Sequence, residues 1–240
     1  MDASLVSAGR AGAPPAEPII SLSEVHLALA SRAGIVEILR GIDLEIAKGV
    51  SVGIVGPSGS GKTTLLMAIA GLERITRGAI KVAGHELARL GEDDLARFRR
   101  DHVGIVFQSF HLIATMTALE NVAVPLEFRG LADALERARR ELDRVGLGHR
   151  LDHYPGQLSG GEQQRVAIAR AVAAGADIVM ADEPTGNLDQ QTGQEIMDLL
   201  FALGADQGTT LLLVTHDRAL ARACDRVIEI RDGRITANAP

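Results

Sequence analysis

This 240-residue sequence has a single cysteine, no long apolar run and no excess of positive charge, and each of these features excludes a class of protein. The single cysteine, Cys224, rules out an internal disulfide and is compatible with a reducing compartment; we interpret it as a buried core thiol. No apolar run approaches the ~18 to 20 residues of a membrane span, and the first residues lack the apolar segment of a signal peptide. We therefore expect a cytoplasmic chain that is held at a membrane only by a partner.

The charge balance is acidic, with 31 acidic and 25 basic residues and a net charge of −6. Because nucleic acid and anionic membranes attract a basic face, this balance argues against unassisted binding to either of them. Hydrophobic residues make up 46% of the chain, which suffices for the core of one large domain with or without a lobe. Residues 1–18, with their Ala, Gly and Pro content, predict a disordered tail.

One stretch carries the clearest chemical signal. Residues 56–63 match the phosphate-loop pattern Gly-x-x-x-x-Gly-Lys-[Ser/Thr] between an apolar run, 51–55, and a helix-forming run, 64–70. Its glycines allow a tight turn in which successive N–H groups face one point, and the following helix adds the positive end of its dipole. We expect Lys62 to contact the β- and γ-phosphates of a nucleotide and Thr63 to ligate Mg²⁺. The predicted phosphate-binding residues are Gly56, Pro57, Ser58, Gly59, Ser60, Gly61, Lys62, Thr63 and Thr64.

Strand-forming and helix-forming segments alternate along most of the chain, which predicts an α/β fold with a mostly parallel central sheet. The segments assigned to it are strands at 51–55, 103–107, 178–181 and 210–214, helices at 64–70, 93–100 and 190–203, and a closing hairpin at 226–236. Residues 19–29 and 36–46 predict an antiparallel β apron beside that sheet, and 79–82 predict a further short strand.

A mostly helical segment, residues 109–174, interrupts this alternation. Its pattern predicts helices at 117–129 and 133–145, the second closed by Gly146. We therefore assign the segment to a helical lobe that is inserted into a sheet core. That core consists of residues 19–108 and 175–240.

Four polar clusters directly follow predicted strands: the phosphate loop, Gln108, Asp182 with Glu183, and His216. Because parallel sheets bind ligands beyond the carboxyl ends of their strands, we expect all four to meet at one rim. Asp182 is a candidate ligand of Mg²⁺, usually through a water, and its alternative role is a helix N-cap. Glu183 is the candidate base that activates water, a role worth ~10² to 10⁴ in rate; a structural glutamate is the alternative.

Gln108 and His216 complete the predicted catalytic set. We expect Gln108 to ligate Mg²⁺ or the attacking water, and its alternative is a solvated loop amide. His216 would donate a hydrogen bond to the terminal phosphate, although a lone histidine at a strand end is more often structural. The other six histidines have no mutual spacing that suggests a metal site.

Residues 159–162 form a second candidate anion site. Ser159 and Glu162 have the spacing of a capping box, and Gly160 and Gly161 lie between them at the start of a predicted helix. Since the chain already has one phosphate loop, both sites cannot surround the same phosphates in a single copy. A head-to-tail homodimer resolves the conflict, because the serine end of one copy then closes over the nucleotide bound to the other. The alternative is a helix start with glycines for packing alone.

Together these motifs resemble the ATP-binding subunit of ABC transporters over nearly all of residues 19–237. The resemblance is carried, in chain order, by a Walker A motif at 56–63, a Q-loop at Gln108, a signature sequence at 158–163, a Walker B motif at 178–183, a D-loop at 187–189 and a switch histidine at His216. It implies a P-loop NTPase fold of the ABC type and a homodimer that hydrolyses two bound Mg·ATP. It also implies that Asp189 communicates between the two sites, a role compatible with its alternative as an N-cap.

Finer details are most similar to the lipoprotein-release and macrolide-export subfamily, and within it to the YbbA-type ATPases. These details are the segments 107–110, 118–122 and 185–189. The likeness implies a separate transmembrane permease that moves lipoprotein, lipid or drug-type cargo and holds the chain at the cytoplasmic face of the inner membrane. The permease would dock on the lobe after Gln108, where Phe110, Leu112 and Ile113 form a candidate apolar patch; plain core packing is the alternative.

One departure from the family concerns the base of the nucleotide. These ATPases usually stack an aromatic ring from the first strands on adenine, whereas this chain has Leu29 near that position and no Phe, Trp or Tyr before Phe98. The loss of stacking would weaken the grip on the base by ~1 kcal/mol and leaves the choice between ATP and GTP open.

Two other classes of function compete with the transporter subunit. A soluble ABC-type regulator that acts on DNA or the ribosome is disfavoured by the acidic balance and by the lack of a long coiled-coil insertion or a second ATPase domain. A small-molecule kinase or GTPase with the same loop would leave the signature element, residues 158–165, unexplained.

Overall fold

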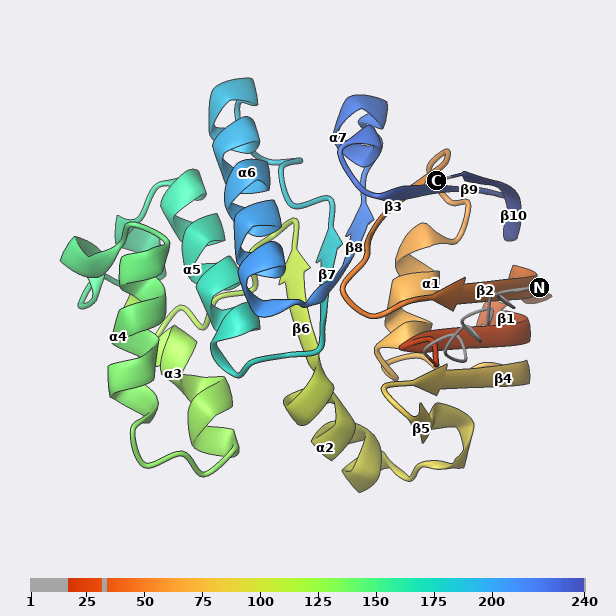
Figure 1. Ribbon diagram of the computed structural model, residues 1–240, viewed down its shortest axis with the longest axis horizontal. Helices are drawn as coiled ribbons and strands as arrows, with labels where there is room; N and C mark the ends of the chain where they lie inside the picture. The colour runs from red at the N-terminus through yellow and green to blue at the C-terminus, as the bar shows by residue number, and fades with distance from the viewer. Residues whose placement is uncertain (1–16, 32–33, 240) are drawn as a thin grey trace, which may run out of the picture.

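The computed structural model describes residues 17–31 and 34–239, which form two sheets and several helices packed in layers (Figure 1). The predicted disordered tail, 1–18, lies outside the described residues except for Glu17 and Pro18. None of the helices in this described part combines the length and the apolar character that crossing a membrane requires.

A six-stranded sheet with the order β10-β9-β3-β8-β7-β6 lies at the centre. Neighbouring strands are parallel except for the β9–β10 hairpin, which is antiparallel, so the prediction of a mostly parallel sheet is confirmed. The strands β3, β7 and β8 are continuous apolar runs because helices or the second sheet cover both of their faces. The six strands are β3 (Ser51–Val55), β6 (Val103–Phe107), β7 (Ile178–Asp182), β8 (Thr210–Val214), β9 (Arg226–Arg231) and β10 (Arg234–Ala239).

A second sheet of four strands, ordered β2-β1-β4-β5, is antiparallel throughout and confirms the predicted apron. Its strands are β1 (Ile20–Ser31), β2 (Gly34–Ile46), β4 (Arg77–Val82) and β5 (His85–Glu86). The pairing of Leu27 with Leu39 and of Ala28 with Glu37 leaves Ile38 as an extra residue, a bulge in β2.

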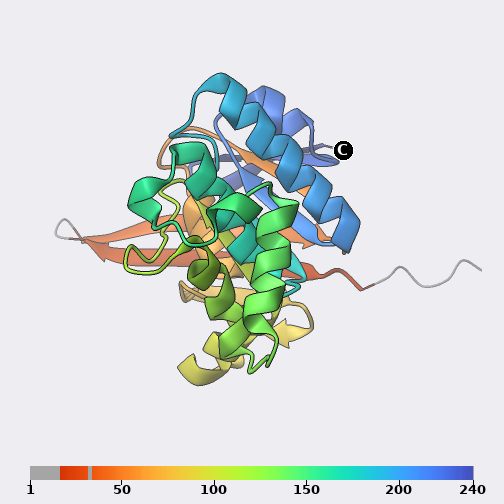
Figure 2. The ribbon, with the colours of Figure 1, turned by 90° about the vertical axis from the view of Figure 1, so that its left-hand side faces the viewer.

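The helices fill the space between and beside the sheets. They are α1 (Lys62–Ile69), α2 (Glu92–His102), α3 (Ala118–Phe128), α4 (Ala134–Arg144), α5 (Gly160–Ala173), α6 (Gln190–Gln207) and α7 (Arg218–Arg222). Figure 1 shows α1 between the two sheets, and α5 and α6 with α3 and α4 on the opposite side of the central sheet. Figure 2, turned by 90°, shows this helical side in front of the strands.

Two apolar cores hold these layers together. One joins the apron and α1 to one face of the central sheet, and the other joins α3, α4, α5 and α6 to its opposite face. Gly104 of β6 lets α5 come close, because a methyl group there would lie 2.2 Å from the carbonyl oxygen of Ala171. The helical segment thus shares its core with β6, β7 and β8. The predicted lobe boundaries at residues 109 and 174 stay a prediction.

The elements predicted from the sequence are confirmed, most of them to within a few residues. The helix predicted at 190–203 continues to Gln207 and ends at Gly208, which has a left-handed conformation with φ of 62°. The sequence did not reveal β5, α7 and three turns of 3₁₀ helix, Leu87–Arg89, Gly148–Arg150 and Pro155–Gln157. Each of these is too short to show a hydrophobic period.

Candidate functional site

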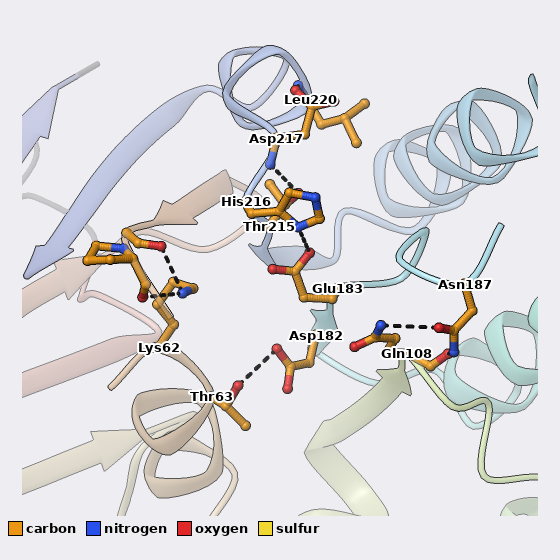
Figure 3. A network of polar contacts seen from close by, with 12 residues as sticks. Lys62, Thr63, Gln108, Asp182, Glu183, Asn187, Thr215, His216, Asp217 and Leu220 are labelled. Atoms are coloured by element: carbon orange, nitrogen blue, oxygen red, sulfur yellow. Dashed lines mark hydrogen bonds and ion pairs between the residues drawn. The ribbon is translucent and has the colours of Figure 1, made fainter. Parts of the chain in front are cut away.

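The strands β3, β8, β7 and β6 are consecutive neighbours, and each ends at one of the four predicted polar clusters. The sheet thereby brings the clusters together at the rim of a pocket of about 550 Å³, part of which is shown in Figure 3. The pocket is lined by Ile38, Gly56, Ser58, Gly59, Gly61, Lys62, Thr63, Thr64, Gln108, Asp182, Glu183, Gly186, Val214 and His216.

The phosphate loop is held in shape by its own backbone and by the β9–β10 hairpin. Gly56 and Gly61 have φ of 153° and 102°, and a methyl group on Gly56 would lie only 2.0 Å from the carbonyl oxygen of Ile230. The amide of Gly233 donates a hydrogen bond of 3.1 Å to the carbonyl oxygen of Ser60, whose side chain is buried beneath the loop. Of the nine predicted phosphate-binding residues, Pro57 and Ser60 are the two that do not line the pocket.

Lys62 lies at the start of α1 with its ammonium group over the loop (Figure 3). Its Nζ donates hydrogen bonds of 2.9 Å to the carbonyl oxygens of Gly56 and Pro57. An ammonium has three donors, so two of them fix the side chain and the third is available for an anion at the mouth of the loop.

Thr63 and Asp182 are two of the three residues that the sequence predicts as magnesium ligands, Gln108 being the third. The Thr63 hydroxyl donates a hydrogen bond of 3.1 Å to Oδ1 of Asp182. Burial raises the pKa of the Asp182 carboxyl above its usual value, against the hydrogen bond from Thr63, and the neighbouring Glu183 raises it further. A hydroxyl and a poorly solvated carboxylate at the same point suit a hard divalent cation, which supplies the missing charge. Within residues 17–31 and 34–239 no cluster of three His, Cys, Asp or Glu side chains offers another metal site.

Glu183 and His216 approach each other across the ends of β7 and β8 (Figure 3). Nδ1 of His216 lies 2.8 Å from Oε2 of Glu183, and the histidine side chain is 77% exposed while that of Glu183 is 21% exposed. Glu183 has a left-handed backbone with φ of 49°, held by a hydrogen bond of 2.9 Å from its N–H to the carbonyl oxygen of Val214. Such a conformation costs of order 1–3 kcal/mol and is concentrated at functional sites.

Gln108 is linked to the loop that follows β7. Its Nε2 donates a hydrogen bond of 3.2 Å to Oδ1 of Asn187, and Nδ2 of Asn187 returns one of 2.9 Å to the Gln108 carbonyl oxygen. A methyl group on Gly186 would lie 2.7 Å from Nε2 of Gln108, so a larger residue there would displace this amide. Gln108 therefore lies beside Asp182 and Glu183 with its orientation fixed from the neighbouring loop.

The signature residues lie elsewhere in the same copy. Ser159 caps α5 in a full capping box, since its side chain accepts a hydrogen bond from the Glu162 amide and Glu162 accepts one from the Ser159 amide. That hydrogen bond from the Ser159 backbone lowers the pKa of Glu162, and Arg150 pairs with the same carboxylate at 2.9 Å. As far as the described residues go, none of Ser159, Gly160, Gly161 and Glu162 lines the pocket.

Asp189 is the N-cap of α6, the role predicted as the alternative to communication between the two sites. Its carboxylate accepts hydrogen bonds from the amide and the hydroxyl of Thr192, and these lower its pKa. The thiol of Cys224 is buried, which raises its pKa to about 11 and confirms the reading of a core cysteine.

Sequence reasoning missed several residues that shape the rim. Gly186 and Asn187 position Gln108, and buried Gln164 donates a hydrogen bond of 2.7 Å from α5 to the carbonyl oxygen of Pro184, next to Glu183. Ile38, the extra residue of the bulge in β2, also lines the pocket. A role for Asn187 could have been predicted, since it belongs to the D-loop motif. The roles of Gly186, Gln164 and Ile38 depend on contacts with residues that are distant in the chain.

The apolar residues predicted to contact the permease and the nucleotide base are only partly exposed. Ile113 is 40% exposed, whereas Leu112 packs against the core of the helical side, so the predicted patch of Phe110, Leu112 and Ile113 is smaller than expected. Leu29, at the position proposed for the base, is 42% exposed and pairs with Val36 across β1 and β2.

Comparison with known proteins places this geometry in a family. The family model described as "ABC transporter" matches residues 39–186. The chain is 47% identical over 227 residues to the "Uncharacterized ABC transporter ATP-binding protein YbbA" of Escherichia coli K12, covering 94% of this chain and 100% of that protein. It is 49% identical over 224 residues to the "Macrolide export ATP-binding/permease protein MacB 1" of Aeromonas hydrophila, covering 92% of this chain but only 34% of that protein.

A solved structure agrees with these relatives. The dimeric structure of a post-hydrolysis state of the ATP-binding cassette MJ0796 bound to ADP and Pi superposes with a TM-score of 0.85 at 40% identity, over 91% of this chain and 97% of that one. The fold, the order of the motifs and the relatives therefore agree. The chain belongs to the ABC transporter family, as an ATP-binding and ATP-hydrolysing subunit.

Proposed function

We propose that this chain is the ATPase of a transporter in which two copies pair head to tail around two Mg·ATP and move a separate membrane permease. The observation that carries the proposal is the separation of two anion-binding devices within one copy. The phosphate loop lines the pocket, and the capped start of α5 does not. A second copy related by a twofold axis supplies the missing end to each pocket. The dimeric state of the MJ0796 cassette supports this pairing.

In the proposed reaction each rim residue has one task. Lys62 holds the β- and γ-phosphates, and Glu183 accepts a proton from the water that attacks the γ-phosphate. Nδ1 of His216 lies 2.8 Å from Oε2 of Glu183 and would orient that carboxylate, while the other ring nitrogen would contact the γ-phosphate.

Thr63 and Asp182 would hold Mg²⁺, with Gln108 at the edge of the same site. When bound, Mg²⁺ would neutralise charge on the β- and γ-phosphate oxygens. Asp189, whose two carboxylate oxygens already accept hydrogen bonds from Thr192 at the start of α6, would contact the second copy through the remaining lone pairs of those oxygens.

We infer a membrane partner from the relatives. The MacB protein is named as an ATP-binding and permease protein, and this chain spans 34% of its length, whereas it spans all of YbbA. By analogy with MacB, a permease would complete this ATPase, and it would hold the ATPase at the cytoplasmic face of the inner membrane. Cargo of the lipoprotein, lipid or drug type would be selected by that permease.

Recovery of the partner tests this proposal. A tagged chain should recover a protein with several membrane spans from detergent-solubilised membranes, and Ile113→Asp should weaken the recovery because Ile113 is exposed in the expected docking segment. Leu135→Asp is the matched control, since Leu135 is 52% exposed on α4 outside that segment. Recovery of nucleic acid or ribosomes in place of a membrane protein would favour a soluble regulator and contradict the proposal.

A further inference from the structure

The segment after Gln108 contains two consecutive residues in a conformation that side chains disfavour. Phe110 and His111 have φ of 59° and 48°, the left-handed region, although neither is glycine. Within the segment, the Phe110 amide donates to the carbonyl oxygen of Phe107 at 3.2 Å and the His111 amide to that of Ser109 at 2.6 Å. These short local bonds shape the turn. Asn187 binds Gln108 before it and Asn121 binds Ile113 after it, and one further contact holds the turn itself on the molecule.

Arg170 of α5 provides that contact. Its Nη1 donates a hydrogen bond of 2.7 Å to the carbonyl oxygen of His111, and its Nη2 donates one of 2.8 Å to that of Phe110. Two nitrogens of one planar guanidinium thus bind two successive carbonyl groups in a rigid fork, which lysine lacks. Arg170 is half-buried and has no acidic partner among the described residues, and burial lowers its pKa. Its charge is therefore stabilised mainly by these two carbonyl dipoles.

The same segment also contacts the other end of α5. A methyl group added to Gly160, the first residue of α5, would lie 3.9 Å from Cζ of Phe110 and 3.3 Å from Cδ2 of Leu188. The ring of Phe110 therefore lies near the start of α5, and its carbonyl group is bound by the long side chain of Arg170 from the same helix. The ring of His111 packs on Phe107, 4.6 Å between centroids, next to Gln108.

We propose that Arg170 is a positioning residue that fastens the Phe110–His111 turn, which directly follows Gln108, to the signature helix, so that a shift of α5 also shifts the backbone that leads to Gln108. The effect on turnover rests on the proposed function, because it presupposes that the chain hydrolyses ATP.

The test compares Arg170→Lys and Arg170→Met with Arg129→Lys. Arg129 is a matched control because it also donates to a backbone carbonyl at the end of α5, that of Ala174, but lies away from the rim. In both Arg170 variants we expect kcat for ATP to fall about tenfold to a hundredfold, since a small misplacement of a catalytic group has this effect. The affinity for nucleotide should stay unchanged, and amide hydrogens of residues 107–113 should exchange faster. Arg129→Lys should leave all three measurements near those of the unaltered chain.

A rescue experiment separates positioning from general stability. Glycine adopts the left-handed conformation without strain, so His111→Gly in the Arg170→Lys background should restore part of the lost kcat. Unchanged kcat and exchange in folded Arg170→Lys, or equal losses in Arg129→Lys, would overturn the inference. A wild-type chain that fails to hydrolyse ATP would instead contradict the proposed function, so the two failures are distinguishable.

Discussion

The pocket rim and the start of α5 are built from similar devices but differ in completeness. At the rim, Thr63 contacts Asp182 and Glu183 contacts His216, so the groups of one copy already meet. The start of α5 also combines glycines, a capping serine and a helix dipole, but within the described residues it lies outside the pocket at the rim. The strand ends thus form a site within one chain, whereas the start of α5 contributes to a site only in the proposed pairing with a second copy.

The largest expected effect is at the phosphate loop, where Lys62→Ala removes the ammonium group held over the loop. We expect ATP binding to weaken by about tenfold to a hundredfold, because a charged hydrogen-bond partner of phosphate is worth roughly 1.5–3 kcal/mol. Equilibrium binding of a fluorescent ATP analogue measures it. An affinity equal to that of the unaltered chain would contradict the role given to Lys62.

Glu183→Gln should separate chemistry from binding at the rim. The amide keeps the shape of the side chain but cannot accept a proton, so turnover should fall by ~10² to 10⁴ while ATP still binds. Phosphate release under saturating Mg·ATP provides the measurement. Residual turnover above a tenth of the original would show that another group serves as the base.

Ser159→Ala sharpens the comparison, because the chain contains a matched capping box at Thr117 and Glu120 on α3. Each alanine variant should lose about 1 kcal/mol of stability through its helix cap. Only Ser159→Ala should also lower kcat, by about tenfold, because only the α5 cap is proposed to contact the nucleotide of the second copy. Denaturant unfolding and ATPase assays on both variants provide the test, and an equal loss of kcat in Thr117→Ala would reduce Ser159 to a structural cap.

The smallest expected effect concerns pH. The pKa of Glu162 is lowered in the folded chain, first by its hydrogen bond from the Ser159 backbone and further by Arg150, so its stabilising contribution is present above its unfolded pKa of about 4.3. That contribution is lost as pH falls through the folded pKa. Glu162→Gln should therefore cost about 1 kcal/mol at pH 7 and less near pH 4. If the loss of stability in Glu162→Gln does not change with pH, the effect comes from the shape of the side chain and not from its charge.

The sequence predicted the residues at the pocket rim better than the residues that hold them in position. Asp182 and His216 could be placed because each directly follows an apolar strand, and parallel strand ends share one edge. Gln164 and Arg170 could not, since a polar residue inside a helix pattern shows no sign of the distant carbonyl group that it binds. The left-handed turn at Phe110 was equally hidden, because its residue type disfavours that conformation.

The central claim is that ATP joins two copies, and the mass of the Glu183→Gln chain in solution tests it most directly. Light scattering should give 25.3 kDa without nucleotide and about twice that value with saturating Mg·ATP, returning to the single value when Ser159→Arg is added. A Glu183→Gln chain that binds ATP yet stays at 25.3 kDa would contradict the account.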